Sequence, residues 1–184
     1  MDIVVNNAGL SLSRSLLETT VADWDLQHDV MAKGSFLVSR SAAKVLIDQK
    51  LGGDVIHISS KNSLFAGPNN IAYSATKADH QAHQVRLLAA ELGEYGVRVN
   101  GINPDGVVRG SGIFAGGWGA KRAAVYGVPE EKLGEYYAQR TLLKREVLPE
   151  NVANAVFVLC TSDLSHTTGL HIPVDAGAAA AFLR

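Results

Sequence analysis

The order of the apolar segments constrains the fold of this chain more than any other feature. Short β-branched runs alternate with long stretches of helical periodicity, and the runs read "DIVVNN" (2–7), "DVIHISS" (54–60), "VRVNGIN" (97–103) and "GLHIPVDAG" (169–177). Strands that alternate with helices predict a parallel sheet with helices on both faces. We therefore expect an α/β fold of three layers with a mostly parallel sheet, in a single domain over residues 1–184.

Two long helices are expected between the first three strands. Apolar residues recur at helical spacing from about Val21 to Gln49, Thr20 or Asp23 can cap this helix, and Gly52-Gly53 follows its end. The second long helix covers "NIAYSATKADHQAHQVRLLAAELGEYG" (70–96), with a glycine as its last residue. These two helices make the second and fourth elements of a β-α-β-α-β order.

The part of the chain after the third strand is less regular. Pro104 ends that strand, and a glycine-rich stretch from Asp105 to about Glu130 shows no regular helical pattern. Shorter helices are expected over Glu130–Arg140 and Glu150–Thr161, the second with a proline near its start. We interpret the glycine-rich stretch as a flexible loop.

Composition excludes several classes of protein. The chain is 47% hydrophobic and 19% charged with a net charge of −1, so no basic patch argues for nucleic acid or an anionic membrane. No segment reaches the ~18 apolar residues of a membrane helix, and the first residues lack a signal peptide, so a cytoplasmic protein is expected. Cys160 is the single cysteine, which rules out an intramolecular disulfide and predicts a buried, inert thiol.

Polar and small residues follow three of the predicted strands. They are Asn6-Asn7-Ala8-Gly9, Ser59-Ser60 and Asn103-Pro104. Parallel sheets bind their ligands at the carboxyl ends of the strands. The sequence therefore predicts a binding site where these three segments meet.

Tyr73 and Lys77 lie four residues apart near the start of the second long helix, so their side chains share one face. A free tyrosine has a pKa near ~10 and is a poor base at neutral pH. A neighbouring ammonium and the positive end of the helix both favour the phenolate and lower that pKa. Ser60, at a neighbouring strand end, could hold a substrate oxygen that exchanges a proton with the tyrosine. This set of groups suits the interconversion of an alcohol and a carbonyl.

The pair alone is weak, because Tyr-x-x-x-Lys in an arbitrary helix is surface decoration. Together, "NNAG", "ISS", the thirteen residues from Ser60 to Tyr73, "YSATK" and "VRVNGINP" resemble the short-chain dehydrogenase/reductase family, over essentially the whole chain. The resemblance implies a Rossmann-like fold and NAD or NADP as cofactor. It implies Tyr73 as general acid/base, Ser60 as the group that orients and polarises the substrate oxygen, and Lys77 as the group that lowers the pKa of Tyr73 and holds the nicotinamide ribose.

The same resemblance implies where a cofactor would lie and how the protein would assemble. The residues implied in cofactor binding, besides Tyr73 and Lys77, are Asn6, Asn7, Ala8, Gly9, Pro104, Gly106 and Val107. No metal is implied. The Ala-rich long helices fit the dimer or tetramer interface that is common in the family, so a homo-oligomer with a small-molecule substrate is expected.

A narrower resemblance concerns the substrate. The segments "NPDGVVRGSGIFAGGWGAKRAAVYG", "YYAQRTLLKREVLPENVANAVFVL" and "VDAG" are similar to the dehydrogenase portion of the bifunctional rhamnulose-1-phosphate aldolase/lactaldehyde dehydrogenase proteins of rhamnose catabolism. That resemblance implies a small hydroxyaldehyde such as lactaldehyde. An aldehyde can be oxidised as its hydrate, and the same site could instead reduce it to a diol.

The sequence departs from the family pattern in three places. Met31 stands where many members have an asparagine, which argues against a proton relay there, and Asp105 interrupts the usual Pro-Gly after the third strand. No Gly-rich turn of the form G-x-x-x-G-x-G precedes a helix, so the chain corresponds to the C-terminal strands and helices of the family from the fourth strand onward. We therefore expect this chain alone to bind NAD(P) poorly.

Three alternatives stay open at this point. The chain could be a catalytically incomplete fragment that serves as an oligomerisation or interaction domain, for which the missing Gly-rich turn speaks. It could be a short-chain reductase of a different carbonyl substrate. An epimerase or dehydratase shares Tyr-x-x-x-Lys, but the "NNAG" form and the short C-terminal region argue against it.

Histidines and a second group of cations have plain structural interpretations. His80 and His83 are expected on a solvated or interface face of the helix rather than in a metal pair, and His57 is expected to be a hydrogen-bonded core residue. Trp118, Lys121 and Arg122 fall in the glycine-rich loop, which is either the substrate lid that the family resemblance implies or a plain surface loop. In a lid, a cation there could meet a carboxylate or phosphate.

Overall fold

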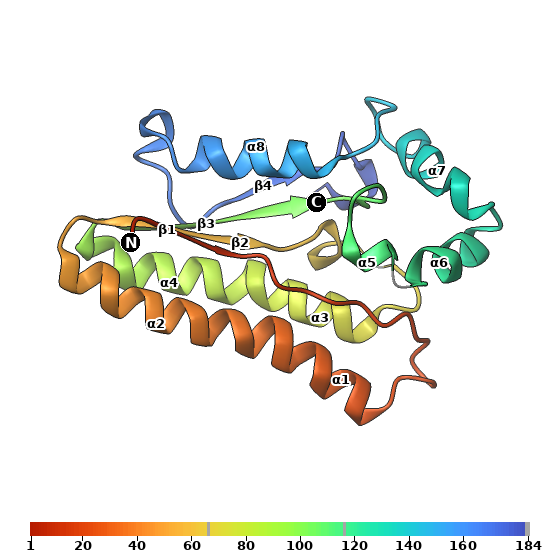
Figure 1. Ribbon diagram of the computed structural model, residues 1–184, viewed down its shortest axis with the longest axis horizontal. Coiled ribbons are helices and arrows are strands. Elements are labelled where there is room, and N and C mark those ends of the chain that lie inside the picture. The colour runs from red at the N-terminus through yellow and green to blue at the C-terminus, as the bar shows by residue number, and fades with distance from the viewer. Residues whose placement is uncertain (66, 116, 183–184) are drawn as a thin grey trace.

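Four parallel strands form one sheet at the centre of the molecule (Figure 1). The structure is a computed structural model that describes residues 1–65, 67–115 and 117–182. The strands follow the order β1-β2-β3-β4, and their bounds are β1 Ile3–Asn6, β2 Gly53–Ile58, β3 Val97–Pro104 and β4 His171–Val174. In the register, Val55 of β2 lies opposite Val4 of β1 and Val99 of β3. All three pairings are parallel, which confirms the predicted sheet.

Helices cover both faces of this sheet. Figure 1 shows α2 (Gly34–Gln49) and α4 (Val85–Leu92) below the strands and α8 (Pro149–Leu159) above them. Successive residues of a strand point to opposite faces, so Val55 packs on the side of α2 and α4 while Ile56 packs on the side of α8. The prediction of three layers is therefore confirmed.

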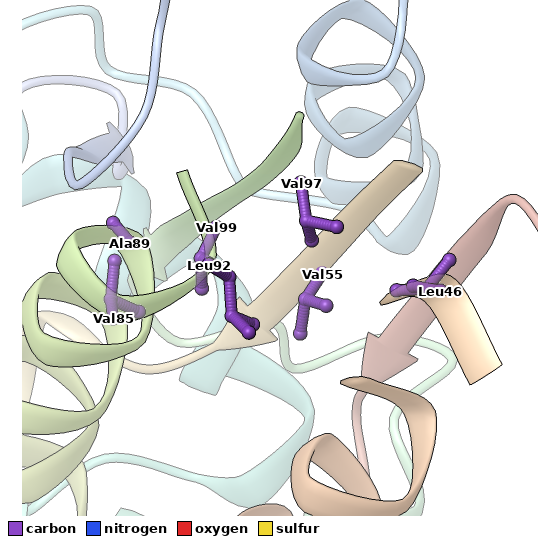
Figure 2. Close-up of a cluster of buried hydrophobic side chains, with 7 residues drawn as sticks. All are labelled: Leu46, Val55, Val85, Ala89, Leu92, Val97 and Val99. Carbon is purple, nitrogen blue, oxygen red and sulfur yellow. The ribbon is translucent and has the colours of Figure 1, made fainter. Parts of the chain in front are cut away.

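The core between the sheet and its lower helices is built from branched aliphatic side chains. Figure 2 shows these seven buried residues, which come from α2, α4, β2 and β3: Leu46, Val55, Val85, Ala89, Leu92, Val97 and Val99. The opposite core contains Ile56, Ile102 and Leu159, the last from α8. Burial of such side chains stabilises the fold by about 1.5–3 kcal/mol each, which makes these two clusters the main support of the sheet.

Each of the two predicted long helices contains a π-helical segment. The first runs as α1 (Val21–Gln27), η1 (His28–Lys33) and α2, and the second as α3 (Ile71–Asp79), η3 (His80–Gln84) and α4, followed by the 3-10 turn η4 (Gly93–Tyr95). The two wide segments are joined by side chains of η3 that reach backbone carbonyls of η1. His80 Nε2 lies 3.1 Å from the Met31 carbonyl oxygen, and Gln84 donates to the Ala32 carbonyl at 2.9 Å. These bonds join the second long helix to the first.

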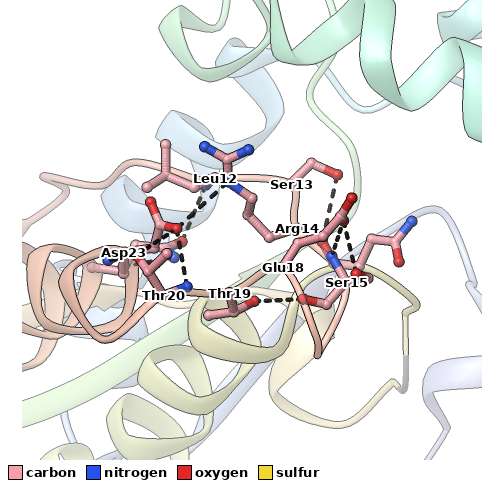
Figure 3. Close-up of polar contacts among 10 residues, drawn as sticks. Leu12, Ser13, Arg14, Ser15, Glu18, Thr19, Thr20 and Asp23 are labelled. Carbon is pink, nitrogen blue, oxygen red and sulfur yellow. Dashed lines mark hydrogen bonds and ion pairs between the residues drawn. The ribbon is translucent and has the colours of Figure 1, made fainter.

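The start of α1 uses both of the predicted capping residues. The Thr20 hydroxyl accepts from the backbone N–H of Asp23 at 3.0 Å, and the Asp23 carboxylate accepts from the backbone N–H of Thr20 at 3.2 Å (Figure 3). A reciprocal pair of this kind satisfies two backbone donors that a helix start leaves free. The loop before it is braced in the same way, since Glu18 accepts from the Ser15 hydroxyl at 2.7 Å.

The glycine-rich stretch is not a flexible loop without helix, and this prediction was wrong. It contains α5 (Gly112–Ala115) and α6 (Trp118–Tyr126), and Gly127 ends α6 with a φ of +67°. Helix α6 forms because its apolar side packs on the next helix, where Ala123 joins Leu133 and Tyr137 in a buried cluster. The glycines therefore mark the ends of α6 instead of preventing it.

The last two predicted helices are confirmed. The first is the 3-10 turn η5 (Glu130–Lys132) followed by α7 (Leu133–Gln139), and the second is α8 with Pro149 in its first turn. Just beyond α8, Cys160 is only partly buried, and burial raises the pKa of its thiol. Among the described ranges, no helix is long and apolar enough to cross a membrane.

Candidate active site

Ser60, Tyr73 and Lys77 meet at the carboxyl end of the sheet. Ser60 follows β2 and caps the short 3-10 turn η2 (Lys61–Ser63), and the other two residues lie in the first turns of α3. The Ser60 side chain lies close to the Tyr73 hydroxyl. Lys77 Nζ lies 5.8 Å from the centre of the Tyr73 ring. The fold thus brings together three groups that the sequence separates by up to seventeen positions.

The electrostatics of this group differ from the expectation in one respect. Burial raises the pKa of Tyr73, and the neighbouring Ser60 side chain lowers it by a smaller amount. Lys77 is 3% exposed, burial lowers its pKa to about 8, and its ammonium donates to the Ile58 carbonyl at 2.7 Å. Because the effect of burial is larger than that of Ser60, the net pKa shift of Tyr73 is upward, opposite to the predicted direction.

The turn after β1 passes closely over Lys77. A Cβ added to Gly9 would lie 3.8 Å from Lys77 Nζ and 3.6 Å from Met31 Sδ. Met31 is fully buried, and the Thr76 hydroxyl approaches its sulfur at 3.8 Å. Met31 is therefore a packed apolar neighbour of the site, and its side chain offers no hydroxyl or amide for proton transfer.

One cavity of about 790 Å³ contains almost all of the predicted site residues. Its lining includes Asn7, Ala8, Gly9, Ser60, Tyr73, Lys77, Pro104, Gly106 and Val107. Asn6 is the exception, because its side chain is buried beneath the sheet. Its amide donates to the Ser39 hydroxyl at 2.9 Å and lies 3.4 Å from His57 Nε2, so its contacts are structural.

A buried ion pair in the cavity wall was not predicted. The Lys61 ammonium pairs with the Asp105 carboxylate, and the two side chains are 9% and 3% exposed. Asp105 also accepts from the backbone N–H of Gly106 at 2.6 Å. Gly106 must lack a side chain, since a Cβ there would lie 2.6 Å from Cε1 of Tyr137. The pair therefore fixes the loop after β3 to the loop after β2, and the Pro-Asp-Gly sequence was its one visible signal.

The second wall of the cavity comes from α6. Trp118 and Arg122 line the cavity, whereas Lys121 is exposed. Arg122 is 2% exposed and donates to the Pro68 carbonyl at 3.0 Å. The prediction that these residues lie in an irregular loop was wrong. They belong to the regular helix α6, and the inner face of that helix forms part of the cavity wall.

Three histidines lie under the site, in the layer between the sheet and the lower helices. His57 is fully buried with Nε2 3.4 Å from the Ser39 hydroxyl, which confirms it as a core histidine. His80 is 1% exposed, so its predicted place on a solvated face was wrong, while His83 is exposed. Burial lowers the pKa of His57 to about 3, and those of His80 and His171 to about 4 each.

These histidines predict acid-sensitive stability. The pKa values of these histidines in the folded chain lie below the ordinary 6.5. As the pH falls below 6.5, the histidines of the unfolded chain are protonated while those of the folded chain stay neutral. The free energy of unfolding is fully present above that pH and decreases by up to ~1.4 kcal/mol per histidine and pH unit toward pH 4. Urea unfolding at pH 8 and pH 5.5 should show a loss of roughly 2–4 kcal/mol.

A histidine variant separates this effect from general acid denaturation. His57→Gln removes one buried titrating group, so the decrease in unfolding free energy between the two pH values should become smaller by about 1 kcal/mol. His166→Gln changes an exposed histidine and should leave the decrease as it is. Equal unfolding free energies of the unmodified chain at both pH values would rule out a contribution of the buried histidines.

Comparison with known proteins agrees with the geometry. Residues 1–179 match the family described as Enoyl-(Acyl carrier protein) reductase. The Bacillus subtilis protein named uncharacterized oxidoreductase YuxG is 45% identical over 184 residues, which are 100% of this chain and 27% of that protein. Carbonyl reductase [NADPH] 2 of Sus scrofa is 30% identical over 177 residues, covering 96% of this chain and 67% of that protein.

A solved structure extends the likeness to three dimensions. Sorbitol-6-phosphate 2-dehydrogenase SrlD from Erwinia amylovora superposes with a TM-score of 0.89 at 28% identity, over 96% of this chain and 68% of that one. The chain therefore belongs to the short-chain dehydrogenase/reductase family. It spans about a quarter of the Bacillus protein and about two thirds of the other two relatives.

Proposed function

We propose that this chain carries the catalytic residues of an NAD(P)-dependent oxidoreductase that interconverts an alcohol and a carbonyl. The observation that supports this most directly is the proximity of Ser60 and Tyr73 in the lining of one cavity, with Lys77 beside them. The alternatives of an epimerase and of a purely structural fragment have no comparable observation in their favour. Because all three side chains line the same cavity, a substrate bound there can reach each of them, as proton transfer requires.

The residues present fit a nicotinamide cofactor. Gly9 gives the turn after β1 a surface free of side chain next to the Lys77 ammonium, and Pro104, Gly106 and Val107 line the same cavity. The named activity of the porcine relative includes NADPH. We propose that these residues, with Asn7 and Ala8, hold NAD or NADP, which supplies or accepts the hydride. The chain itself supplies the proton chemistry.

The roles of the three side chains follow from their contacts. Tyr73 exchanges a proton with the substrate oxygen, and Ser60, which lies beside the tyrosine, holds that oxygen in place. Lys77 now donates to the Ile58 carbonyl, and the same ammonium lies close enough to the tyrosine ring to stabilise a phenolate. Burial keeps the tyrosine protonated at neutral pH, so it is ready to donate a proton to a carbonyl.

The substrate class we propose is a small hydroxyaldehyde or its alcohol, with lactaldehyde as the first candidate. The motif similarity in residues 103–127 supports this choice. The Bacillus relative supports it too, because the matching region makes up only 27% of that protein, as in a dehydrogenase joined to further polypeptide. In the oxidising direction Tyr73 would take a proton from one hydroxyl of the aldehyde hydrate.

Transfer of an isotope tests the reaction class directly. An alcohol from a panel of small diols and hydroxy acids, deuterated at the reacting carbon, is incubated with the protein and a large excess of NAD or NADP, because this chain alone is expected to bind the cofactor poorly. We expect deuterium at the reduced nicotinamide, detected by mass spectrometry. If no alcohol in the panel transfers deuterium while the protein stays folded, the proposed function is wrong.

We also propose that the protein self-associates through its two long helices. Helix α2 exposes Phe36 and Val45 at 48% and 41%, although its other face is buried against the sheet. Phe36→Glu should lower the molecular mass measured by light scattering to that of the monomer. Leu51→Glu is the control, since Leu51 is exposed in the turn beyond α2. A monomeric unmodified protein, or an unaltered mass of the Phe36 variant, would contradict this interface.

A further inference from the structure

Helix α6 brings a buried cation to the catalytic cavity. Arg122 lines the same cavity as Ser60 and Tyr73 and is only 2% exposed. Its Nη1 donates to the Pro68 carbonyl at 3.0 Å, and the guanidinium also lies close to the hydroxyl of Tyr137. These contacts hold the guanidinium in one place, as a binding group requires.

The partners of this guanidinium are all neutral. Its central carbon lies 4.8 Å from the centre of the Tyr126 ring and 5.6 Å from that of Trp118. Among residues 1–65, 67–115 and 117–182, no carboxylate forms an ion pair with it. Its Nε is buried without a hydrogen-bond partner, and the same is true of Nε1 of Trp118. Burying a charge without a counter-charge raises the free energy of the folded protein. This part of the cavity wall therefore lacks an acceptor for the Nε–H of the guanidinium.

The charges around the cavity show the same imbalance. The charged residues of its lining are Lys61, Lys77, Arg122 and Asp105. Asp105 is occupied by Lys61, and Lys77 is bonded to a backbone carbonyl beside Tyr73. Of the three cations in the lining, Lys61 is paired with a carboxylate and Lys77 lies beside Tyr73. Arg122 is the remaining one, and no carboxylate of the lining pairs with it.

We infer that the substrate carries, besides its reacting carbon, a carboxylate or phosphate group that binds to Arg122. This inference rests on the proposed alcohol–carbonyl reaction. It replaces lactaldehyde, the first candidate named above, with hydroxy acids or phosphorylated hydroxy compounds as the substrate class. A planar guanidinium fits both kinds of oxyanion with paired hydrogen bonds, and the Trp118 N–H adds a further donor in the same wall. Lactaldehyde lacks such a group, whereas lactate, its oxidation product, has one.

Equilibrium binding with matched probes tests the inference without turnover. Tartrate is compared with erythritol, and glycerol 3-phosphate with glycerol, each by titration calorimetry on the unmodified protein. We expect at least one anionic probe to bind ~10- to 100-fold more tightly than its neutral match, and the better of the two tells carboxylate from phosphate. Equal affinities for the charged and neutral members of both pairs would overturn the inference.

Variants locate the effect at Arg122. Arg122→Gln should abolish the preference for the anionic probe, and Lys121→Gln, on the exposed side of the same helix, should preserve it. Arg122→Lys and Trp118→Phe cover the case in which Arg122→Gln fails to fold, and both should weaken the preference. A preference that survives in Arg122→Gln, or is unchanged in both of these variants, would place the anion elsewhere and refute the inference.

A tyrosine variant keeps this test apart from the proposed function. Tyr73→Phe should keep the preference for the anionic probe over its neutral match, because the phenol would contact a hydroxyl that both probes carry. If isotope transfer fails while the Arg122-dependent preference is present, the proposed reaction is wrong and the anion site stands. If isotope transfer occurs with neutral alcohols and no preference for the anionic probes is found, the proposed reaction stands and the anion site at Arg122 is wrong.

Discussion

Replacing Tyr73 with phenylalanine is expected to lower kcat by about a thousandfold, which corresponds to about 4 kcal/mol of transition-state stabilisation. The phenol lies beside Ser60, where it can pass a proton to a bound oxygen. The ring stays, so packing is retained and the free energy of unfolding should change by ~1 kcal/mol or less. The measurement is NAD(P)-dependent turnover of the alcohol that shows isotope transfer.

The control for this prediction is another tyrosine far from the cavity. Tyr95 is 44% exposed at the end of the second long helix, and Tyr95→Phe should leave kcat unchanged. A Tyr73→Phe protein that turns over like the unmodified one would show that a different group transfers the proton. Similar losses in both variants would point to a general loss of folding.

The largest effect on stability is expected from Asp105→Asn. The substitution keeps an oxygen for the Gly106 N–H but leaves the Lys61 ammonium buried without its counter-charge. Breaking one partner of such a pair typically costs about 3–5 kcal/mol, and the midpoint of thermal unfolding should fall by roughly 10 °C. Urea and thermal unfolding followed by circular dichroism measure both quantities.

Two further proteins make this prediction specific to the buried pair. Lys61→Met in the Asp105→Asn background removes the uncompensated charge and should recover much of the lost stability. Glu135→Gln breaks the exposed pair with Lys132, and the free energy of unfolding should stay close to that of the unmodified protein. If Asp105→Asn destabilises the protein no more than Glu135→Gln does, the pair does not hold the two loops together.

Local patterns predicted most of the fold because strand and helix periods are local. The four strands and both long helices could be located from β-branched runs, apolar spacing and the Thr20–Asp23 cap. Helix α6 was missed because glycines at both of its ends resemble a loop, and only its packing on Leu133 and Tyr137 makes it regular. Contacts of that kind join residues that are distant in the chain.

The candidate site divides in the same way. The places of Ser60, Tyr73 and Lys77 follow from short motifs, so the sequence sufficed to bring them together. The pairing of Lys61 with Asp105 and the neutral surroundings of Arg122 depend on loops from three different parts of the chain. The burial of His80 was missed for a related reason, since it depends on contact with the Met31 carbonyl in another helix.

The π-helical segment η3 has a consequence for how one helix serves two purposes. Ala72, Thr76 and His80 are buried and lie four residues apart, and Val85, which is also buried, follows His80 by five. In a regular α-helix successive side chains are rotated by ~100° about the axis. A step of five would therefore turn the buried side chains of α4 away from the sheet. The wider turn restores the phase. Tyr73 and Lys77 of α3 can therefore face the cavity while Val85 of α4 packs in the core. Deleting one residue of η3 would misplace either the side chains of α3 or those of α4.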